Sequence, residues 1–247
     1  MRIFTLMLLC LSGSATAEDA LVAVATNFAE VAEELCDEFE MQSGYKVSLA
    51  SGSSGKLYAQ ILNGGPFDVF LSADGVLPER IEQSEFGVKG SRFTYAIGRL
   101  ALWSADADLI QEDARKTVLQ DRIRKLAIAN PALAPYGVAS RETLQSLGAW
   151  DAVSEKIVMG ENISQAAALA GTGNADAGFI ALSFAVRTDR PLGGRYIVIP
   201  GDLHSPVRQD AVLLRHGANN EAAREFVAFL RSEKVIRRIE ARGYEVP

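Results

Sequence analysis

Short apolar runs of strand length alternate along this chain with longer segments in which apolar and polar residues recur with a helical period. Uninterrupted runs such as Leu21–Ala25 are typical of strands that are buried on both faces of a sheet. A longer run, from Arg92 to Ser104, predicts a strand that crosses between two domains. The remaining strands are predicted at 45–49, 67–71, 126–129, 156–159, 177–181, 196–199 and 211–214.

Helices are predicted between these strands. In the first of them, Phe28, Val31 and Leu35 recur at helical spacing, with acidic residues between them. Either Thr26 or Asn27 is expected to be the N-cap of this helix, because both side chains can accept a backbone N–H bond. Further helices are predicted at 57–62, 78–83, 108–121, 138–147, 163–170, 221–231 and 233–242.

The alternation of strands and helices predicts an α/β fold with mainly parallel sheets. Two such sets of elements occur, one before and one after the segment 92–104. Ligands of open α/β sheets bind at the carboxyl ends of the strands. We therefore expect a ligand site in a cleft between two lobes.

Composition and charge narrow the class of ligand. The chain has 247 residues and a formal net charge of −6, and we find no basic stripe. A nucleic-acid partner is therefore not expected. The net negative charge does not exclude an anionic ligand, because backbone dipoles and hydroxyl groups can bind an anion without any net positive charge.

The first residues predict a cleavable signal peptide. Arg2 supplies the positive charge, Ile3–Leu11 the apolar region, and Ala15–Ala17 a small-residue cleavage motif. The apolar region is too short to span a bilayer. We expect an exported, periplasmic protein whose one remaining cysteine, Cys36, is a buried apolar residue.

Small and capping residues occupy the strand-to-helix junctions. The richest is the turn ASGSSGK at 50–56, and similar junctions lie at 26–27, 72–73, 135–137 and 162–164. The first N–H groups of a helix lack intrahelical partners and attract anions. Each junction alone could simply cap its own helix. Together they predict a pocket of neutral donors, which favours a fully deprotonated tetrahedral dianion over a protonated one. We expect Lys56 to point into water.

Catalytic motifs are weak by comparison. The phosphate-loop pattern fails because Gly55 and Lys56 are followed by Leu57, and no GxSxG elbow is present. A secreted hydrolase with Ser53 or Ser54 as its nucleophile stays open as an alternative, but it needs a nearby base. The chain's two histidines, His204 and His216, lie in polar turns far from every junction, and no metal-ligand cluster is evident.

Seven motifs taken in order carry a resemblance to a known family. They are AVATNF (23–28), SGSSGKL (51–57), FDVFLSAD (67–74), SRFTYAIGRLALW (91–103), NPALAPYG (130–137), ADAGFIA (175–181) and GY (243–244). The chain resembles the periplasmic molybdate-binding proteins of ABC transporters over essentially its whole mature length. The resemblance implies a type II periplasmic-binding fold, with two lobes, two crossing segments and a tetrahedral oxyanion in the interlobe cleft.

The resemblance also implies the domain organisation and the activity. Residues 1–17 form the signal peptide, 18–97 and 202–247 form lobe 1, and 98–201 form lobe 2. The expected protein is a monomer and not an enzyme, has no cofactor, and delivers molybdate and tungstate to the permease subunits of an ABC transporter. Alternatives are another oxyanion, such as sulfate or phosphonate, and a sensory module of the same fold.

Three ligand positions are carried over directly from the family pattern. Ser54 matches the binding serine of the second turn, Ala73 matches a backbone N–H donor, and Ile163 matches an N–H donor at the start of a second-lobe helix. Molybdenum enters only as part of the bound molybdate, so no separate metal site is implied.

Three further positions depart from the commonest pattern. Thr26 and Asn27 stand where that pattern has a single serine, which indicates a branch that uses both residues. Tyr136 stands where the pattern has alanine, and Ala181 stands where it has a binding tyrosine. We therefore expect Tyr136 to supply the missing hydroxyl from another loop.

Overall fold

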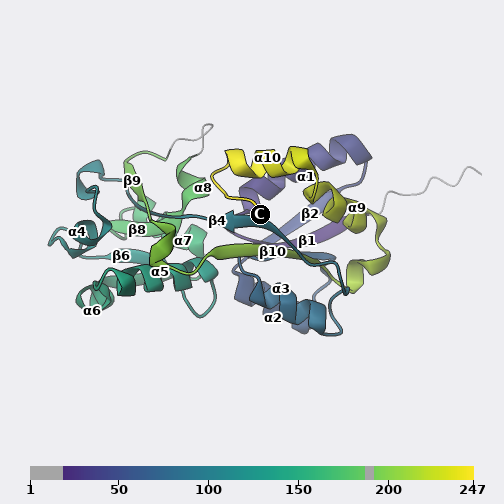
Figure 1. Ribbon diagram of the computed structural model, residues 1–247, viewed down its shortest axis with the longest axis horizontal. Helices are drawn as coiled ribbons and strands as arrows, with labels where there is room; N and C mark the ends of the chain where they lie inside the picture. The colour runs from purple at the N-terminus through teal and green to yellow at the C-terminus, as the bar shows by residue number, and fades with distance from the viewer. Residues whose placement is uncertain (1–18, 187–191) are drawn as a thin grey trace, which may run out of the picture.

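The computed structural model describes residues 19–186 and 192–247 as two lobes that lie side by side (Figure 1). Each lobe contains a five-stranded sheet, with the strand orders β2-β1-β3-β10-β4 and β7-β6-β8-β5-β9. The α/β class and the two-lobed architecture are therefore confirmed. The predicted signal peptide lies outside the described residues.

The strand bounds follow the apolar runs closely. The first sheet contains β1 (Ala20–Ala25), β2 (Val47–Gly52), β3 (Val69–Leu71), β4 (Phe93–Gly98) and β10 (Val207–Leu213). The second sheet contains β5 (Leu100–Ser104), β6 (Leu126–Ala129), β7 (Ile157–Gly160), β8 (Ala177–Ala181) and β9 (Arg195–Val198).

The helices lie between these strands and at the end of the chain. They are α1 (Ala29–Ser43), α2 (Ser54–Leu62), α3 (Val76–Gln83), α4 (Ala114–Leu119), α5 (Pro135–Ser146), α6 (Trp150–Val153), α7 (Ile163–Gly171), α8 (Leu182–Ala185), α9 (Glu221–Leu230) and α10 (Glu233–Ala241). None of the helices in the described ranges has both the length and the apolar content needed to cross a membrane.

The predicted long strand is two strands that belong to different sheets. β4 ends at Gly98 and β5 begins at Leu100, so the chain passes from one lobe to the other at Arg99. It returns to the first sheet as β10. Because each crossing strand enters its new sheet from the opposite end, β10 is antiparallel to β3 and β4, and β5 is antiparallel to β8 and β9. The sheets are therefore mixed rather than mainly parallel.

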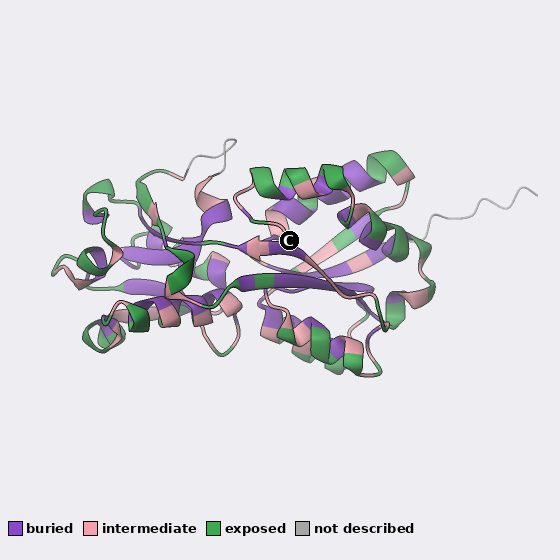
Figure 2. Cartoon of the chain, in the orientation of Figure 1, coloured by how far each residue is buried: buried purple, intermediate pink, exposed green. Residues whose placement is uncertain are grey.

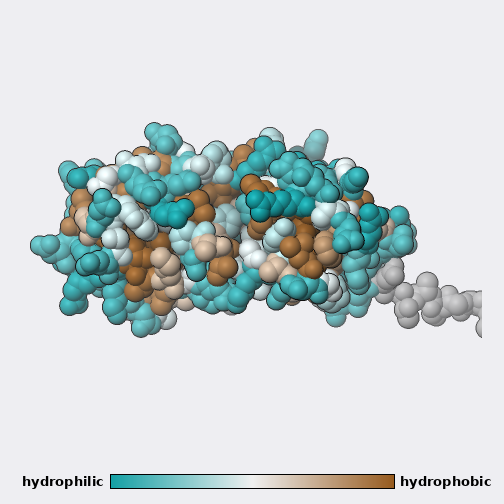
Figure 3. All heavy atoms as spheres, turned by 90° about the horizontal axis from the view of Figure 1, so that it is seen from below, coloured by the Kyte–Doolittle hydropathy of each residue, from teal (hydrophilic) through white to brown (hydrophobic). Residues whose placement is uncertain are grey.

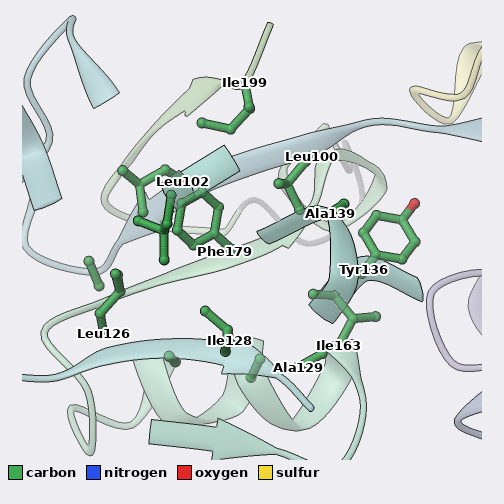
Figure 4. Packing of buried hydrophobic residues seen from close by; sticks show 14 of the residues in the cluster. Leu100, Leu102, Leu126, Ile128, Ala129, Tyr136, Ala139, Ile163, Phe179 and Ile199 are labelled. Atoms are coloured by element: carbon green, nitrogen blue, oxygen red, sulfur yellow. The ribbon is translucent and has the colours of Figure 1, made fainter. Parts of the chain in front are cut away.

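Both faces of the first sheet are covered by helices. α1, α9 and α10 lie on one side of it, and α2 and α3 lie on the other (Figure 1). In the second lobe, the side chains of β5, β6 and β8 pack against α5 and α7 (Figure 4). The central strands β1, β3 and β10 of the first sheet and β5, β6 and β8 of the second are buried along almost their whole length (Figure 2). The edge strands β2 and β9 are largely not buried.

Cys36 lies buried in α1, as the sequence predicts, and is not in a disulfide. Burial raises the pKa of its thiol to about 12, and the negative charges of Asp37 and Glu33 act in the same direction. Because the thiolate is the reactive form, we expect the folded chain without its first 17 residues to be almost inert to a disulfide reagent at pH 8. The chain unfolded in denaturant should react promptly. A native protein that reacts as fast as the unfolded one would contradict this burial. Cys36→Ser, which has no thiol, measures the background reaction.

Candidate functional site

The turns that follow the strands of one lobe contact those of the other. The Gly55 N–H, in the first turn of α2, donates to the Leu133 carbonyl at 3.0 Å. The Ser164 hydroxyl of α7 lies 3.4 Å from the Thr26 carbonyl after β1. Because these bonds join carboxyl-end turns of both sheets, the lobes are closed upon each other where the ligand site was expected.

Lys56 also crosses between the lobes. Its Nζ lies 2.5 Å from Oε2 of Glu161, in the turn after β7. The expectation that Lys56 points into water is therefore only half right, because its side chain is 54 % exposed but is paired. An isolated helix gives no sign of this partner, since Glu161 belongs to the other lobe.

The six predicted ligand residues lie in or beside these turns. Five of them are at most 3 % exposed, and Thr26 is half-buried. Ser54 and Ile163 are the first residues of α2 and α7, and Tyr136 is the second residue of α5. Their backbone N–H groups therefore belong to first helical turns, which lack intrahelical partners. Ala73 follows β3, directly beside Ser54.

Ser54 and Ala73 are in direct contact. The Ala73 N–H donates to Oγ of Ser54 at 3.0 Å. Ser53 lies directly before Ser54 and is expected from the sequence only as an alternative nucleophile, not as a ligand. Its Oγ is buried and has no hydrogen-bond partner among the described residues. Since a buried hydroxyl without a partner is costly, Ser53 is a further candidate donor that sequence reasoning missed.

Asn27 is not the N-cap of α1, and neither is Thr26. Phe28 holds that position without any side-chain cap bond. The Asn27 amide nitrogen instead donates to Oε1 of Gln209 at 2.9 Å and lies 3.3 Å from the Tyr244 hydroxyl. These long-range partners outcompete the local cap. They also engage the side-chain N–H groups of Asn27. Its backbone N–H has no partner among the described residues and is therefore the donor left for a ligand.

Tyr136 brings a hydroxyl from the second lobe to the boundary between the lobes. Nε2 of Gln209 donates to this hydroxyl at 3.3 Å. Figure 4 shows the hydroxyl pointing away from the aliphatic side chains around it. Burial raises the pKa of Tyr136 well above its usual value, and the pKa of Tyr244 to about 12. Both groups are therefore neutral phenols at physiological pH and keep a proton to donate.

Asp74 is the carboxylate next to Ala73, but it is turned toward α3. Its Oδ1 accepts the Leu77 N–H at 2.6 Å, and the Ser72 hydroxyl lies 3.1 Å from Oδ2. Asp74 therefore accepts an N–H of the first turn of α3, whose N-cap position is held by Gly75. Burial raises the pKa of Asp74, although both hydrogen bonds oppose this.

Neither histidine is placed to activate a serine. Nδ1 of His216 lies 2.7 Å from Oδ1 of Asp68, and Nδ1 of His204 lies 2.8 Å from the Ser205 carbonyl. A serine nucleophile needs a base within hydrogen-bond reach, and the structure gives no such contact to Ser53 or Ser54 among the described residues. The same residues contain no cluster of three or more histidine, cysteine and acidic side chains that could hold a metal cation.

A mainly apolar groove of about 600 Å³ opens beside the candidate site. Gly55 and Ala73 line it on the first lobe and Leu133 on the second, but Asn27, Ser54 and Tyr136 do not. It lies between α3 and α5, which is the side of the molecule that Figure 3 faces, where hydrophobic residues are interspersed with hydrophilic ones. An inorganic anion fits the buried polar turns better than this apolar groove.

Two lobes joined by two crossing segments, with polar turns of both lobes buried between them, define the class of two-lobed solute-binding proteins. The chain belongs to the bacterial extracellular solute-binding protein family, whose model matches residues 20–245.

Individual relatives agree with this assignment. The chain is 42 % identical to the molybdate-binding protein ModA of Azotobacter vinelandii, over 95 % of this chain and 92 % of the relative. It is also 42 % identical to ModA of Rhodobacter capsulatus, over 93 % and 89 %. The solved periplasmic molybdate-binding protein of A. vinelandii superposes with a TM-score of 0.88 at 38 % identity, covering 92 % of this chain and 99 % of that one. The expected family is confirmed, and these relatives are solute-binding proteins, not enzymes.

Proposed function

We propose that this protein binds molybdate, and also tungstate, between its lobes in the periplasm and delivers it to the permease of an ABC transporter. Residues 18–97 and 202–247 form lobe 1 and residues 98–201 form lobe 2 of a monomer. The proposed ligands are Thr26, Asn27, Ser54, Ala73, Tyr136 and Ile163, with Ser53 as an addition.

The convergence of buried neutral donors from both lobes is the observation that carries the proposal. Such donors satisfy the oxygens of a tetrahedral dianion, and each hydrogen bond is stronger once water is excluded. The backbone N–H groups among them cannot accept the proton of hydrogen phosphate, so they favour an anion that carries no proton. The 42 % identity to two molybdate-binding proteins favours molybdate among the dianions.

Titration calorimetry of the chain without its signal peptide tests this function. The titrants are molybdate, tungstate, sulfate and phosphate. We expect molybdate and tungstate to bind tightly at one site per chain and the other two to bind far more weakly. No heat with molybdate, or tighter binding of sulfate, would reject the proposed ligand.

Removing the Ser54 hydroxyl should weaken this binding. Ser54→Ala loses one donor to a charged ligand, which is worth about 1–3 kcal/mol, so we expect the dissociation constant for molybdate to rise between several-fold and about 150-fold. The matched control is Ser51→Ala, because Ser51 lies near the end of β2, just before the turn, and is exposed. If the two variants bind molybdate equally well, Ser54 is not a ligand.

A further inference from the structure

Gln209 is fully buried on β10, the strand that returns from lobe 2 to lobe 1. None of the proposed ligand positions includes it. Its side-chain amide nevertheless contacts residues of both lobes at the candidate site. A buried amide has to satisfy its donors and its acceptor within the protein, so its partners are informative about its role.

The Gln209 oxygen faces lobe 1. Oε1 accepts the Asn27 amide at 2.9 Å and lies 3.0 Å from the Tyr95 hydroxyl. The Tyr95 hydroxyl also lies 3.0 Å from the Ser72 carbonyl, so its one proton is divided between two acceptors, this carbonyl and Oε1 of Gln209. That carbonyl and the Ala73 N–H belong to one peptide group, and this N–H donates to Oγ of Ser54.

The Gln209 nitrogen faces lobe 2. Nε2 donates to the Tyr136 hydroxyl at 3.3 Å and thereby occupies a lone pair of the phenol oxygen. The one proton of Tyr136 must then point elsewhere, and it has no acceptor among the described residues. With this geometry Tyr136 is a donor toward the site and not an acceptor.

The backbone around this contact is shaped to allow it. The register of β10 shifts between Gln209 and Asp210, and such a bulge changes the direction of nearby side chains. Gly98, at the end of β4, lies directly against the contact. A Cβ at Gly98 would be 2.2 Å from the Tyr136 oxygen and 2.5 Å from Nε2 of Gln209. Only glycine lets the two side chains meet here.

We propose that Gln209 is a positioning residue that directs the Tyr136 proton toward the bound anion, and so restricts the site to fully deprotonated oxyanions. The inference rests on the proposed function, since it concerns the same site. Gln209 touches the donors and not the anion. Its effect on affinity therefore passes through Tyr136.

Replacing the amide by a carboxylate reverses one of these bonds. The carboxylate of Gln209→Glu has no N–H to offer, so it accepts the Tyr136 proton and turns a phenol lone pair toward the ligand. We expect molybdate affinity to fall at least tenfold. The ratio of phosphate to molybdate affinity should rise at least tenfold, because hydrogen phosphate can donate its proton to that lone pair. Gln145→Glu makes the same change of charge at an exposed position of α5 and should alter neither quantity.

A second pair of variants separates positioning from a general packing role. Gln209→Met keeps the apolar part of the side chain and removes both hydrogen-bonding groups. We expect it to weaken molybdate binding about tenfold in the native background but less than threefold in a Tyr136→Phe background, because the group it directs is already gone. Gln209→Met and Tyr136→Phe are titrated only after a cooperative thermal unfolding transition has shown that each variant is folded at the temperature of the titration.

The outcomes distinguish the two proposals. If the wild-type chain binds none of the four anions, both the function and the role of Gln209 are rejected. If the wild type binds molybdate, but the effects of Gln209→Met and Tyr136→Phe multiply and Gln209→Glu leaves the phosphate-to-molybdate ratio unchanged, only the role of Gln209 is rejected.

Discussion

Ser54→Asp is expected to abolish molybdate binding and to leave the protein folded. A carboxylate at this position lies at the start of α2, beside the Ala73 N–H. Two unit charges 4 Å apart repel by about 4 kcal/mol at an effective dielectric constant of 20, and the dianion carries two charges. We expect the dissociation constant for molybdate to rise at least ~1000-fold.

The same substitution should not destabilise the ligand-free protein. The first turn of α2 contains no acidic residue, and a negative charge there interacts favourably with the helix dipole. The donors proposed for the anion can also satisfy the new carboxylate. Ser51→Asp adds the same charge at an exposed position near the end of β2 and should bind molybdate nearly as the wild type does. A Ser54→Asp protein that still binds molybdate tightly would place the anion elsewhere.

Arg92→Leu is expected to give the largest loss of stability. Nη1 of Arg92 lies 2.6 Å from Oδ2 of Asp210, a carboxylate with no exposed surface. The hydrogen bond to Asp210 raises the pKa of Arg92 above its usual value, so the cation persists at any working pH. Removing Arg92 leaves the buried Asp210 carboxylate with Thr94 and the mostly exposed Arg208, 3.5 Å away, as its remaining partners. We therefore expect the free energy of unfolding of the ligand-free protein to fall by about 3 kcal/mol in urea titrations.

Two further variants check this explanation. Adding Asp210→Asn to Arg92→Leu removes the buried carboxylate charge and should recover at least ~1 kcal/mol, since the amide still accepts from Thr94. Arg122→Leu breaks the exposed pair with Asp106 and should cost less than about 1 kcal/mol. Equal losses for Arg92→Leu and Arg122→Leu would mean that burial of Asp210 does not matter.

The elements that the sequence predicted well are those whose signal is local. The uninterrupted run at 126–129 is buried along its whole length and forms β6 with the predicted bounds. The segment 92–104 has the same kind of signal, but nothing in its pattern marks Arg99 as the point where the chain changes sheets. That break is imposed by the separation of the two lobes, which is a tertiary feature.

The candidate site was predictable as a set of turns but not as a network. Helix starts rich in small residues indicated Ser54 and Ile163, because the chemistry of a helix N-terminus is local. Gln209 gave no such signal. It stands between Arg208 and Asp210, ahead of the run at 211–214 that predicted the strand. Its partners Asn27 and Tyr136 are 182 and 73 residues away, so only the fold reveals them.

The contacts between the lobes also govern how long a ligand stays. The proposed donors, apart from half-buried Thr26, are at most 3 % exposed, so an anion among them can leave only after the lobes separate. Separation breaks the bond from Gly55 to Leu133 and the ion pair of Lys56 with Glu161. The residence time is then set by how often the lobes open, and high ionic strength shortens it by screening the partly exposed ion pair. A permease that pulls the lobes apart can release the cargo without competing for any of its oxygens.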